Sequence, residues 1–474
     1  MKISDFKSLR RFFRKIKRPV IGAGVYAFDR LGPEDFIPQY QILSLRSSEE
    51  TKLIRRDVPV FCLEEKIKKG LRPRNASTLI SHHLTQKYLS RFKEPLILFY
   101  KSSQRIEETA KNLRFKIGVA PYRFGRDLFE NKAKFRRILQ KIGVSSTPGK
   151  ILSPSFFYHS TFSEFKKEFG LPFVVQHPSG GGGKGTFFIN NEADLEKANK
   201  SIKEFPPKEI IVAKFVKGPS PSVTGCVTKF GVLSTRPQYQ IYDIPLLYSR
   251  PVGSGLFCGH DWSASIFSGN VLRQVREAVE RIGLYFKKLG YRGVFGVDFV
   301  QDAKKDKIYV TECNPRMLGS MPTLTMVEAE KNIPPIMAFH ILEYLNTPYE
   351  IDKKKIESLL WQKVEGSQML LCNSSAKEVV QNGEMKPGIY KLVDEKKQWE
   401  KLRFIRPAYK FSQLRDKSEI LISEGLQKKG ARVYSYQRLA RIILKERVLD
   451  ADLGDITPSA KKVINLVSKE IKVN

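Results

Sequence analysis

The stretch that decides the fold is Gly293–Met317, GVFGVDFVQDAKKDKIYVTECNPRM, in a chain of 474 residues. Two short apolar runs, Val294–Val300 and Ile308–Thr311, lie on either side of a polar turn that is rich in lysine. Both runs contain β-branched residues and alternate between apolar and polar side chains. This pattern predicts two antiparallel strands joined by a turn.

Three side chains with oxygen atoms lie on this predicted strand pair. Asp298 is inside the first strand, and Glu312 and Asn314 close the second. Residues two apart on a strand share a face, so Glu312 and Asn314 can both point towards Asp298. Oxygen ligands on one sheet face suit a hard divalent cation. Arg316 continues this face with a guanidinium that can hold a phosphate or a carboxylate. A solvated hairpin surface is the alternative interpretation.

A glycine run upstream favours the metal-site interpretation. Pro172–Phe188 reads PFVVQHPSGGGGKGTFF, in which an apolar strand enters the glycines and a second strand leaves them. Glycine lets backbone N–H groups approach phosphate oxygens without interference from a Cβ atom. A flexible linker would be flanked by polar residues and not by aromatic and β-branched strands. The run therefore predicts a phosphate-binding loop.

The two stretches together, in this order and at this spacing, resemble the ATP-grasp superfamily over roughly residues 125–345. The glycine loop is most similar to that of the biotin carboxylase and carbamoyl phosphate synthetase branch. The resemblance implies an α/β fold with α+β elements. Its parts are a pre-ATP-grasp nucleotide-fold-like domain, an ATP-grasp domain pair and an additional C-terminal unit. It also implies ATP-driven activation of a carboxylate, or of bicarbonate, as an acyl phosphate that a nucleophile then attacks.

The resemblance also implies a set of site residues, with one departure from the family pattern. The family has a phosphate-binding lysine at the end of the strand before the glycine loop, and this chain has Gln176 there. Glutamine donates a hydrogen bond but brings no charge, and Lys184 inside the loop is expected to compensate. The implied catalytic residues are Arg316 and Lys184. The implied nucleotide-binding residues are Lys132, Gln176, Gly181, Gly182, Gly183, Lys184, Lys214, Phe215 and Val216. The implied cofactors are ATP and Mg²⁺, with Mn²⁺ as an alternative metal, held by Asp298, Glu312 and Asn314.

The substrate-binding residues are expected in Ser234–Ala264, which has no clear periodicity and is rich in aromatic residues. Long irregular segments inside a compact domain are usually functional or disordered, and the aromatic content argues against disorder. We expect this segment to be a loop that shapes the acceptor pocket. Arg236 and Arg250 are the candidate carboxylate clamps.

The amino-acid composition indicates which kinds of partner the chain could bind and where it could be located. The 83 basic and 49 acidic residues give a formal net charge of +34, which suggests an anionic partner such as nucleic acid or a membrane surface, or a lysine-rich proteome. The five cysteines show no CxxC spacing, and no run of eighteen apolar residues is present. These features lead us to expect a cytoplasmic protein. Asp5–Arg18 predicts a basic amphipathic helix that docks on the protein itself or lies peripherally on an anionic membrane.

Three units are expected along the chain. Residues 1–125 predict a parallel-sheet domain with the basic N-terminal helix, because strand and helix patterns alternate there. Residues 126–345 form the expected ATP-grasp domain, with a lid subdomain at about 172–233, and residues 346–474 form a C-terminal α/β unit without assigned chemistry. The GxGxxA match Gly22–Ala27 is interpreted as a turn near the first strand and not as a dinucleotide site.

The function predicted from these patterns is an ATP- and Mg²⁺-dependent carboxylate–amine ligase that forms ADP and acts on small molecules. One alternative is a bicarbonate-activating carboxylase of the biotin carboxylase type. The other is a basic ATP-binding scaffold with weak or no turnover, which the uncharged Gln176 supports.

Overall fold

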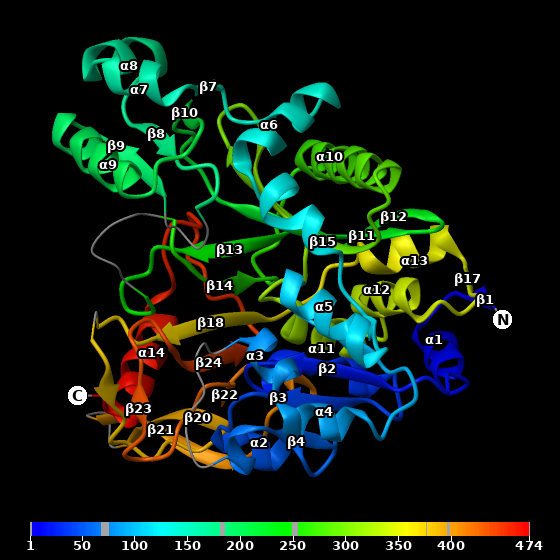
Figure 1. The fold of residues 1–474 in the computed structure, drawn as a ribbon. Coiled ribbons are helices and arrows are strands. Elements are labelled where there is room, and N and C mark those ends of the chain that lie inside the picture. The colour runs from blue at the N-terminus through cyan, green and yellow to red at the C-terminus, as the bar shows by residue number, and fades with distance from the viewer. Residues whose placement is uncertain are drawn as a thin grey trace.

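The computed structural model describes residues 2–67, 75–180, 185–248, 255–375, 377–395 and 399–473. It is a mixed α/β structure, as the sequence predicts, in which three larger sheets are covered by helices (Figure 1). Among the described residues, no helix combines the length and the apolar character needed to cross a membrane.

The N-terminal part of the chain forms a parallel sheet in the order β4-β3-β2-β5-β6. Its strands are β2 (Val20–Gly24), β3 (Gln41–Ser44), β4 (Val60–Cys62), β5 (Leu96–Leu98) and β6 (Lys116–Ile117). Its helices are α1 (Phe6–Phe13), α2 (Glu49–Ile54), α3 (Ala76–Ser81), α4 (His83–Leu89) and α5 (Gln104–Leu113). The parallel sheet confirms the alternation of strands and helices read from the sequence.

The basic N-terminal helix α1 is shorter than the predicted range Asp5–Arg18, because the regular helix ends at Phe13. Asp5 caps it by accepting a hydrogen bond from the Ser8 backbone N–H at 2.7 Å. The apolar side chains of α1, Phe6, Leu9, Phe12 and Phe13, are buried in the core that also contains α11 and α12. The helix therefore docks on the protein's own body.

A second, antiparallel sheet has the strand order β7-β10-β8-β9 and stands apart from the two ends of the chain, at the upper left of Figure 1. Its strands are β7 (Gly149–Leu152), β8 (Phe173–Gln176), β9 (Thr186–Ile189) and β10 (Ile210–Lys214). Helices α7 (Pro154–His159), α8 (Phe162–Phe169) and α9 (Glu192–Glu204) pack on it around a phenylalanine-rich core. The helix α6 (Lys132–Lys141) precedes this sheet in the chain.

The third sheet runs through the rest of the described chain in the order β16-β15-β11-β13-β14-β18-β24-β22-β20-β21, with β12 beside β11. Its first part contains β11 (Pro221–Thr228), β12 (Gly231–Ser234), β13 (Gln238–Tyr242), β14 (Phe257–Asp261), β15 (Gly293–Asp302) and β16 (Lys307–Asn314). Its second part contains β18 (Ser367–Cys372), β20 (Gly388–Glu395), β21 (Trp399–Pro407), β22 (Glu419–Ser423) and β24 (Arg438–Leu444). The antiparallel pairing of β14 with β18 joins the two parts into one sheet.

The remaining elements complete the layers. Helices α10 (Gly269–Lys288), α12 (Ile336–Leu345), α13 (Lys353–Leu360) and α14 (Pro458–Ile471) pack against strands of these sheets, and α11 (Met321–Glu330) packs beside α12. Short strands pair β1 (Lys2–Ile3) with β17 (Glu350–Ile351) and β19 (Val379–Val380) with β23 (Arg432–Val433).

One expectation about the chain path is wrong. The segment Ser234–Ala264 is predicted to be an irregular loop, but it contains the two strands β13 and β14, which pair antiparallel. Tyr239 and Ile241 on β13 and Cys258 on β14 are buried in the core shared with the C-terminal strands. This burial against β18 stabilises strands that the local sequence pattern does not distinguish from a loop.

Helix α11 carries a buried carboxyl group whose pKa leads to a prediction. The Glu328 side chain accepts a hydrogen bond from the Ile336 backbone N–H at 3.1 Å, and burial raises the pKa of Glu328 to about 8. The folded state therefore holds a proton on this group that the unfolded chain releases near the ordinary carboxyl pKa. Glu328 therefore makes the protein less stable as the pH rises from the ordinary carboxyl pKa to about 8. Over this range its contribution lowers the free energy of unfolding by about 1.4 kcal/mol per pH unit.

Glu328→Gln keeps an oxygen that can accept the Ile336 hydrogen bond and removes the titration. We expect the Tm of the wild type to fall more steeply than that of Glu328→Gln between about pH 5.5 and about pH 7.5. Thermal unfolding of both proteins in one buffer series measures this. Parallel Tm–pH curves would contradict the prediction.

Candidate functional site

A cavity of about 500 Å³ lies between the antiparallel sheet β7–β10 and the strands β15 and β16. Its volume is in the range of pockets that bind small molecules and cofactors, which is roughly 300–1,000 Å³. Seven of the residues singled out in the sequence line it: Lys132, Gln176, Lys214, Phe215, Val216, Asp298 and Glu312. Residues from α6, β8, β10, β15 and β16 therefore meet at one place.

The carboxylates of Asp298 and Glu312 lie opposite each other on the strand pair β15–β16. The two residues are register partners, and the register shifts directly after Asp298. Ser222 on β11 donates a hydrogen bond from its hydroxyl to Asp298 Oδ1 at 2.9 Å. Burial, and then the neighbouring Glu312 carboxylate, raise the pKa of Asp298 to about 7. The two carboxyl groups face one cavity and offer it oxygen ligands for a cation.

Asn314 and Arg316 extend this group on the side of the N-terminal sheet. Asn314 donates from Nδ2 to Asp298 Oδ2 at 3.0 Å, and its Oδ1 accepts from Arg316 Nη2 at 2.6 Å. Arg316 also donates from Nε to Glu130 Oε1 at 3.0 Å, and its guanidinium lies over the Tyr100 ring, 4.7 Å from the ring centre. The hairpin thus brings Asp298, Glu312, Asn314 and Arg316 together, as the strand pattern predicts.

Lys132 connects helix α6 to both the carboxylates and the glycine loop. Its Nζ atom lies 3.2 Å from Glu312 Oε2 and donates to the Gly180 carbonyl oxygen at 2.5 Å. The side chain is 8% exposed, and Asn131 caps the helix directly before it by accepting from Lys134 N. A buried ammonium at the first turn of α6 is thereby held where the chain enters the glycine run.

The wall opposite the carboxylates is made by β8 and β10. Gln176 ends β8, pairs with Ile211 of β10, and donates from Nε2 to Thr186 Oγ1 at 3.4 Å. The Phe215 ring packs edge-on against Phe188 at 5.3 Å between centres. Lys214 ends β10, Phe215 and Val216 follow it directly, and all three residues line the cavity.

Several residues predicted for the site are not placed in this cavity. Gly181, Gly182, Gly183, Lys184 and Arg250 lie outside the described residues. Arg236 is half-buried and is not among the described residues that line the cavity. Its backbone N–H donates to the Leu360 carbonyl oxygen at 3.0 Å. The substrate-clamp role of both arginines stays a prediction.

The sequence interpretation missed the contribution of the C-terminal part. Leu449, Leu453 and Gly454 line the cavity, together with Tyr242 on β13. Asp261 at the end of β14 holds this segment, because its Oδ2 accepts from the backbone N–H groups of Val448 at 2.7 Å and Leu449 at 2.9 Å. No local motif marks residues 449–454 in the sequence, so only the folded arrangement shows that they belong to the site.

The residues on β15 and β16 fit a magnesium ion in the chemistry of their donors. Within the described ranges, no group of three or more His, Cys, Asp and Glu side chains is arranged to hold a metal ion. Two carboxylates beside an amide nevertheless supply the hard oxygen ligands that Mg²⁺ takes when it keeps several waters and shares phosphate oxygens. A divalent cation would also relieve the repulsion that contributes to the raised pKa of Asp298.

The sequence around this site is similar to that of known proteins. Residues 129–320 match a family model described as an ATP-grasp domain. A [butirosin acyl-carrier protein]–L-glutamate ligase of Niallia circulans is 22% identical over 201 residues, which are 42% of this chain and 46% of that protein. A D-alanine–D-alanine ligase of Carboxydothermus hydrogenoformans is 28% identical over 196 residues, 39% of this chain and 58% of that protein. The chain thus spans about half the length of these curated relatives.

Among solved structures, the biotin carboxylase domain of the 2-oxoglutarate carboxylase of Hydrogenobacter thermophilus has a TM-score of 0.57 and is 15% identical. The match covers 96% of this chain and 90% of that domain, which was crystallised with MgADP, ADP and bicarbonate. The similarity therefore extends over nearly the whole fold.

Proposed function

We propose that this protein is an ATP- and Mg²⁺-dependent ligase that joins a carboxylate to an amine and releases ADP, since residues 129–320 match a family model described as an ATP-grasp domain. The observation that carries the proposal is the arrangement of Lys132, Asp298 and Glu312 around one cavity of about 500 Å³. The two ligases among the relatives support the same class of reaction.

In the proposed reaction, a substrate carboxylate oxygen attacks the γ-phosphorus of ATP and ADP leaves, which forms an acyl phosphate. The nitrogen of the amine then attacks the acyl carbon, inorganic phosphate leaves, and the amine loses a proton. Chemistry of this kind depends mainly on positioning and on neutralising charge. A bound magnesium ion supplies charge neutralisation on the phosphates.

The residues of the candidate site have separate roles in this reaction. Lys132 would bring its ammonium to the phosphates beside the glycine run, and Asp298, Glu312 and Asn314 would hold the magnesium ion. Arg316 steadies the carboxylate and the acyl phosphate, since Glu130 and Asn314 fix its guanidinium. The backbones of Lys214, Phe215 and Val216 face the base of the nucleotide, and Leu449 and Leu453 close the same cavity from the C-terminal side.

The proposal is tested by screening pairs of carboxylic acids and amines for ADP formation, with mass spectrometry of the condensed products. We expect ADP and a condensed product to appear in equal amounts and to require Mg²⁺. Bicarbonate alone is included as one arm. ADP formed with bicarbonate and without an amine would favour the carboxylase, and nucleotide binding without ADP formation would favour a scaffold.

Removing the Lys132 ammonium tests its assignment to the phosphates. Lys132→Met should weaken binding of a non-hydrolysable ATP analogue about 10- to 100-fold, since a charge-assisted hydrogen bond contributes roughly 1.5–3 kcal/mol. Calorimetric titration of the analogue measures this. Lys134→Met, two residues along the same helix and exposed, is the matched control and should bind as the wild type does. Equal affinities of the two variants would remove Lys132 from the nucleotide site.

A further inference from the structure

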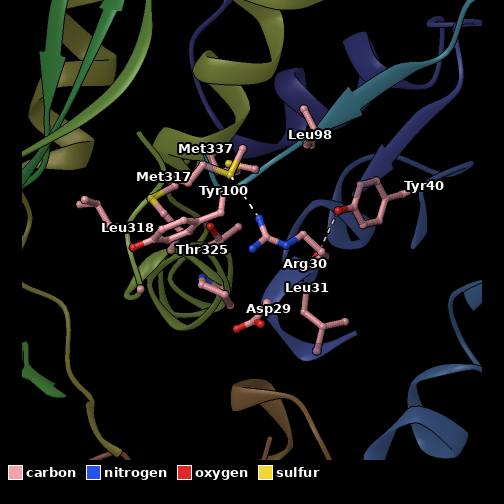
Figure 2. Close-up of a pocket in the computed structure, with 13 residues that line it drawn as sticks. Asp29, Arg30, Leu31, Tyr40, Leu98, Tyr100, Met317, Leu318, Thr325 and Met337 are labelled. Atoms are coloured by element: carbon pink, nitrogen blue, oxygen red, sulfur yellow. Dashed lines mark hydrogen bonds between the residues drawn. The ribbon is translucent and has the colours of Figure 1, made fainter. Parts of the chain in front are cut away.

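A second cavity lies between the N-terminal parallel sheet and the segment that follows β16 (Figure 2). It is lined by Arg30 and Tyr40 from the N-terminal part and by Tyr100, Met317 and Thr325. Its volume is about 30 Å³. A cavity measured in this way needs roughly 10–15 Å³ to hold one water molecule, so this one has space for about two. The cavity therefore has room for the end group of a ligand, of about the size of a carboxylate.

The Arg30 guanidinium points into this cavity and makes no close ion pair, although the Asp29 carboxyl group lines the same cavity and is attracted to it. The side chain is 8% exposed, and Figure 2 shows its guanidinium directed towards Tyr100 and Thr325. Nη1 contacts only the Met317 sulfur, at 3.7 Å, and Nε has no hydrogen-bond partner among the described residues. No carboxylate of the described residues lies within ion-pair distance of Arg30. Thr325 Oγ1 is also buried without a partner in this part of the chain.

Unpartnered buried donors of this kind are unusual. A buried charge costs several kcal/mol unless it is paired and hydrogen-bonded. Most buried polar atoms in folded proteins have a partner, and exceptions are often found at functional sites. A guanidinium and a hydroxyl that face the same cavity form a donor set that complements an anion with two oxygens.

The glycines of the GxGxxA match explain how Arg30 reaches this position. A Cβ atom at Gly24 would lie 2.6 Å from Arg30 Nε, and one at Gly22 would lie 2.8 Å from Arg30 Cβ. The Tyr40 hydroxyl, which would also meet a Cβ at Gly22, donates to the Arg30 carbonyl oxygen at 2.7 Å. The two glycines therefore leave the space in which Arg30 crosses the end of β2.

The cavity is adjacent to the guanidinium that faces the metal-site residues. Arg316 donates from Nη1 to the Met317 carbonyl oxygen at 3.1 Å, and the Met317 sulfur faces Arg30 from the other side. Tyr100 lines the cavity and also lies against the Arg316 guanidinium. An anion beside Arg30 thus lies next to the place where the proposed reaction occurs.

We propose that this cavity binds a non-reacting carboxylate of a substrate, with Arg30 and Thr325 as the residues that hold it. The inference rests on the proposed ligase function. It implies that one of the two substrates is an amino acid or a dicarboxylic acid. A carboxylate is favoured over a phosphate because the Asp29 carboxyl group lines the same cavity and would repel a dianion more strongly than a monoanion.

The test uses acetate as the probe on the full-length chain, with chloride keeping the ionic strength constant. Thermal unfolding and calorimetric titration are measured with acetate, with its neutral isostere acetamide and with inorganic phosphate. We expect acetate to raise the Tm of the wild type and acetamide to leave it unchanged, and we expect phosphate, which can bind beside Lys132, to shift the wild type and Arg30→Gln equally. Arg30→Gln should weaken acetate binding at least about 10-fold, and Arg30→Lys should weaken it less.

Two further variants keep the test decisive. Thr325→Val preserves shape and charge and should weaken acetate binding about 3- to 10-fold, so it replaces Arg30→Gln if that variant does not fold. Arg11→Gln removes the same charge from the exposed face of α1 and should bind acetate as the wild type does. A wild type that shows no acetate shift, a phosphate shift that depends on Arg30 and exceeds the acetate shift, or variants that bind acetate as the wild type does would each overturn the inference.

Failure of this inference can be told apart from failure of the proposed function. A non-hydrolysable ATP analogue with Mg²⁺ is titrated into the same proteins, and Arg30→Gln should bind it with wild-type affinity. If the wild type binds the analogue but not acetate, only the assignment of this cavity fails. If acetate binds through Arg30 but no acid and amine pair yields ADP, the ligase function fails while the anion site remains.

Discussion

Replacing Glu312 by Gln should lower the rate of ADP formation by at least about 100-fold while leaving the fold intact. The substitution is nearly isosteric and removes one of the two carboxylates that face each other across β15 and β16. The effect of losing a group that stabilises transition-state charge is typically about 10²–10³ in rate. Because Lys132 still donates to the Gly180 carbonyl oxygen, its position is retained.

The measurement is ADP release with the substrate pair identified by the screen, at several Mg²⁺ concentrations. Raising the Mg²⁺ concentration should restore part of the Glu312→Gln rate if the residue helps to hold the metal ion. Asp302→Asn, at the far end of β15, is the matched control and should turn over as the wild type does. An unchanged rate in Glu312→Gln would remove this residue from the metal site.

The largest stability effect is expected from Glu424→Gln. The Glu424 carboxylate is 1% exposed and accepts hydrogen bonds from both Arg438 and Arg441, which itself is 1% exposed. Although burial alone would raise it, these two guanidiniums hold the pKa of Glu424 at about 2, so the group is ionised. Removing one partner of a buried ion pair typically costs about 3–5 kcal/mol, because the other charge stays buried without compensation.

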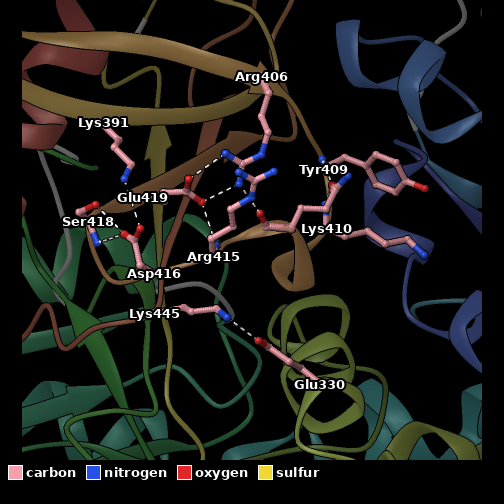
Figure 3. A network of polar contacts seen from close by, with 11 residues as sticks. Glu330, Lys391, Arg406, Tyr409, Lys410, Arg415, Asp416, Ser418, Glu419 and Lys445 are labelled. Carbon is pink, nitrogen blue, oxygen red and sulfur yellow. Dashed lines mark hydrogen bonds and ion pairs between the residues drawn. The ribbon is translucent and has the colours of Figure 1, made fainter.

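Thermal and denaturant-induced unfolding measure this loss. The control is Asp416→Asn in the same part of the chain, whose pairing with Lys391 at 3.2 Å lies on the surface (Figure 3). Surface ion pairs contribute little because water screens them. We therefore expect the Tm of Asp416→Asn to stay close to that of the wild type. Similar Tm values for Glu424→Gln and the wild type would show that the buried network contributes nothing to stability.

The central part of the site could be predicted from the sequence because its information is local. Asp298 and Glu312 sit on strands joined by a short turn, so alternation alone predicts that they share a face. The pairing of the two residues in the structure confirms that prediction. The start of α6 is equally local, since Asn131 is a capping residue and the apolar spacing after Lys132 is helical. Family resemblance then suggested what these residues do.

The parts that could not be predicted depend on contacts between distant segments. Arg30 and Thr325 are nearly 300 residues apart in the chain, and Arg30 looks like any surface arginine in the sequence. Leu449 lines the candidate site, and its backbone N–H donates to Asp261, which is 188 residues earlier in the chain. The local sequence predicts a loop where β13 and β14 lie, because the stabilising partner of β14 is β18, which begins only at Ser367. Tertiary pairing of this kind leaves no periodic signal in a short window.

The hydrogen bonds between β14 and β18 limit how the C-terminal part of this chain can be removed or exchanged. Gly259, His260 and Asp261 pair with Met369, Gln368 and Ser367, so the C-terminal part of the chain supplies a ladder partner to the sheet that carries the candidate site. A shortened protein that stops after α12 would present unpaired peptide groups along β14 and self-associate through them. An exchanged C-terminal module would succeed only if it brought a strand in the same register. The C-terminal strands and the strands that carry the candidate site therefore have to be exchanged together, as one sheet.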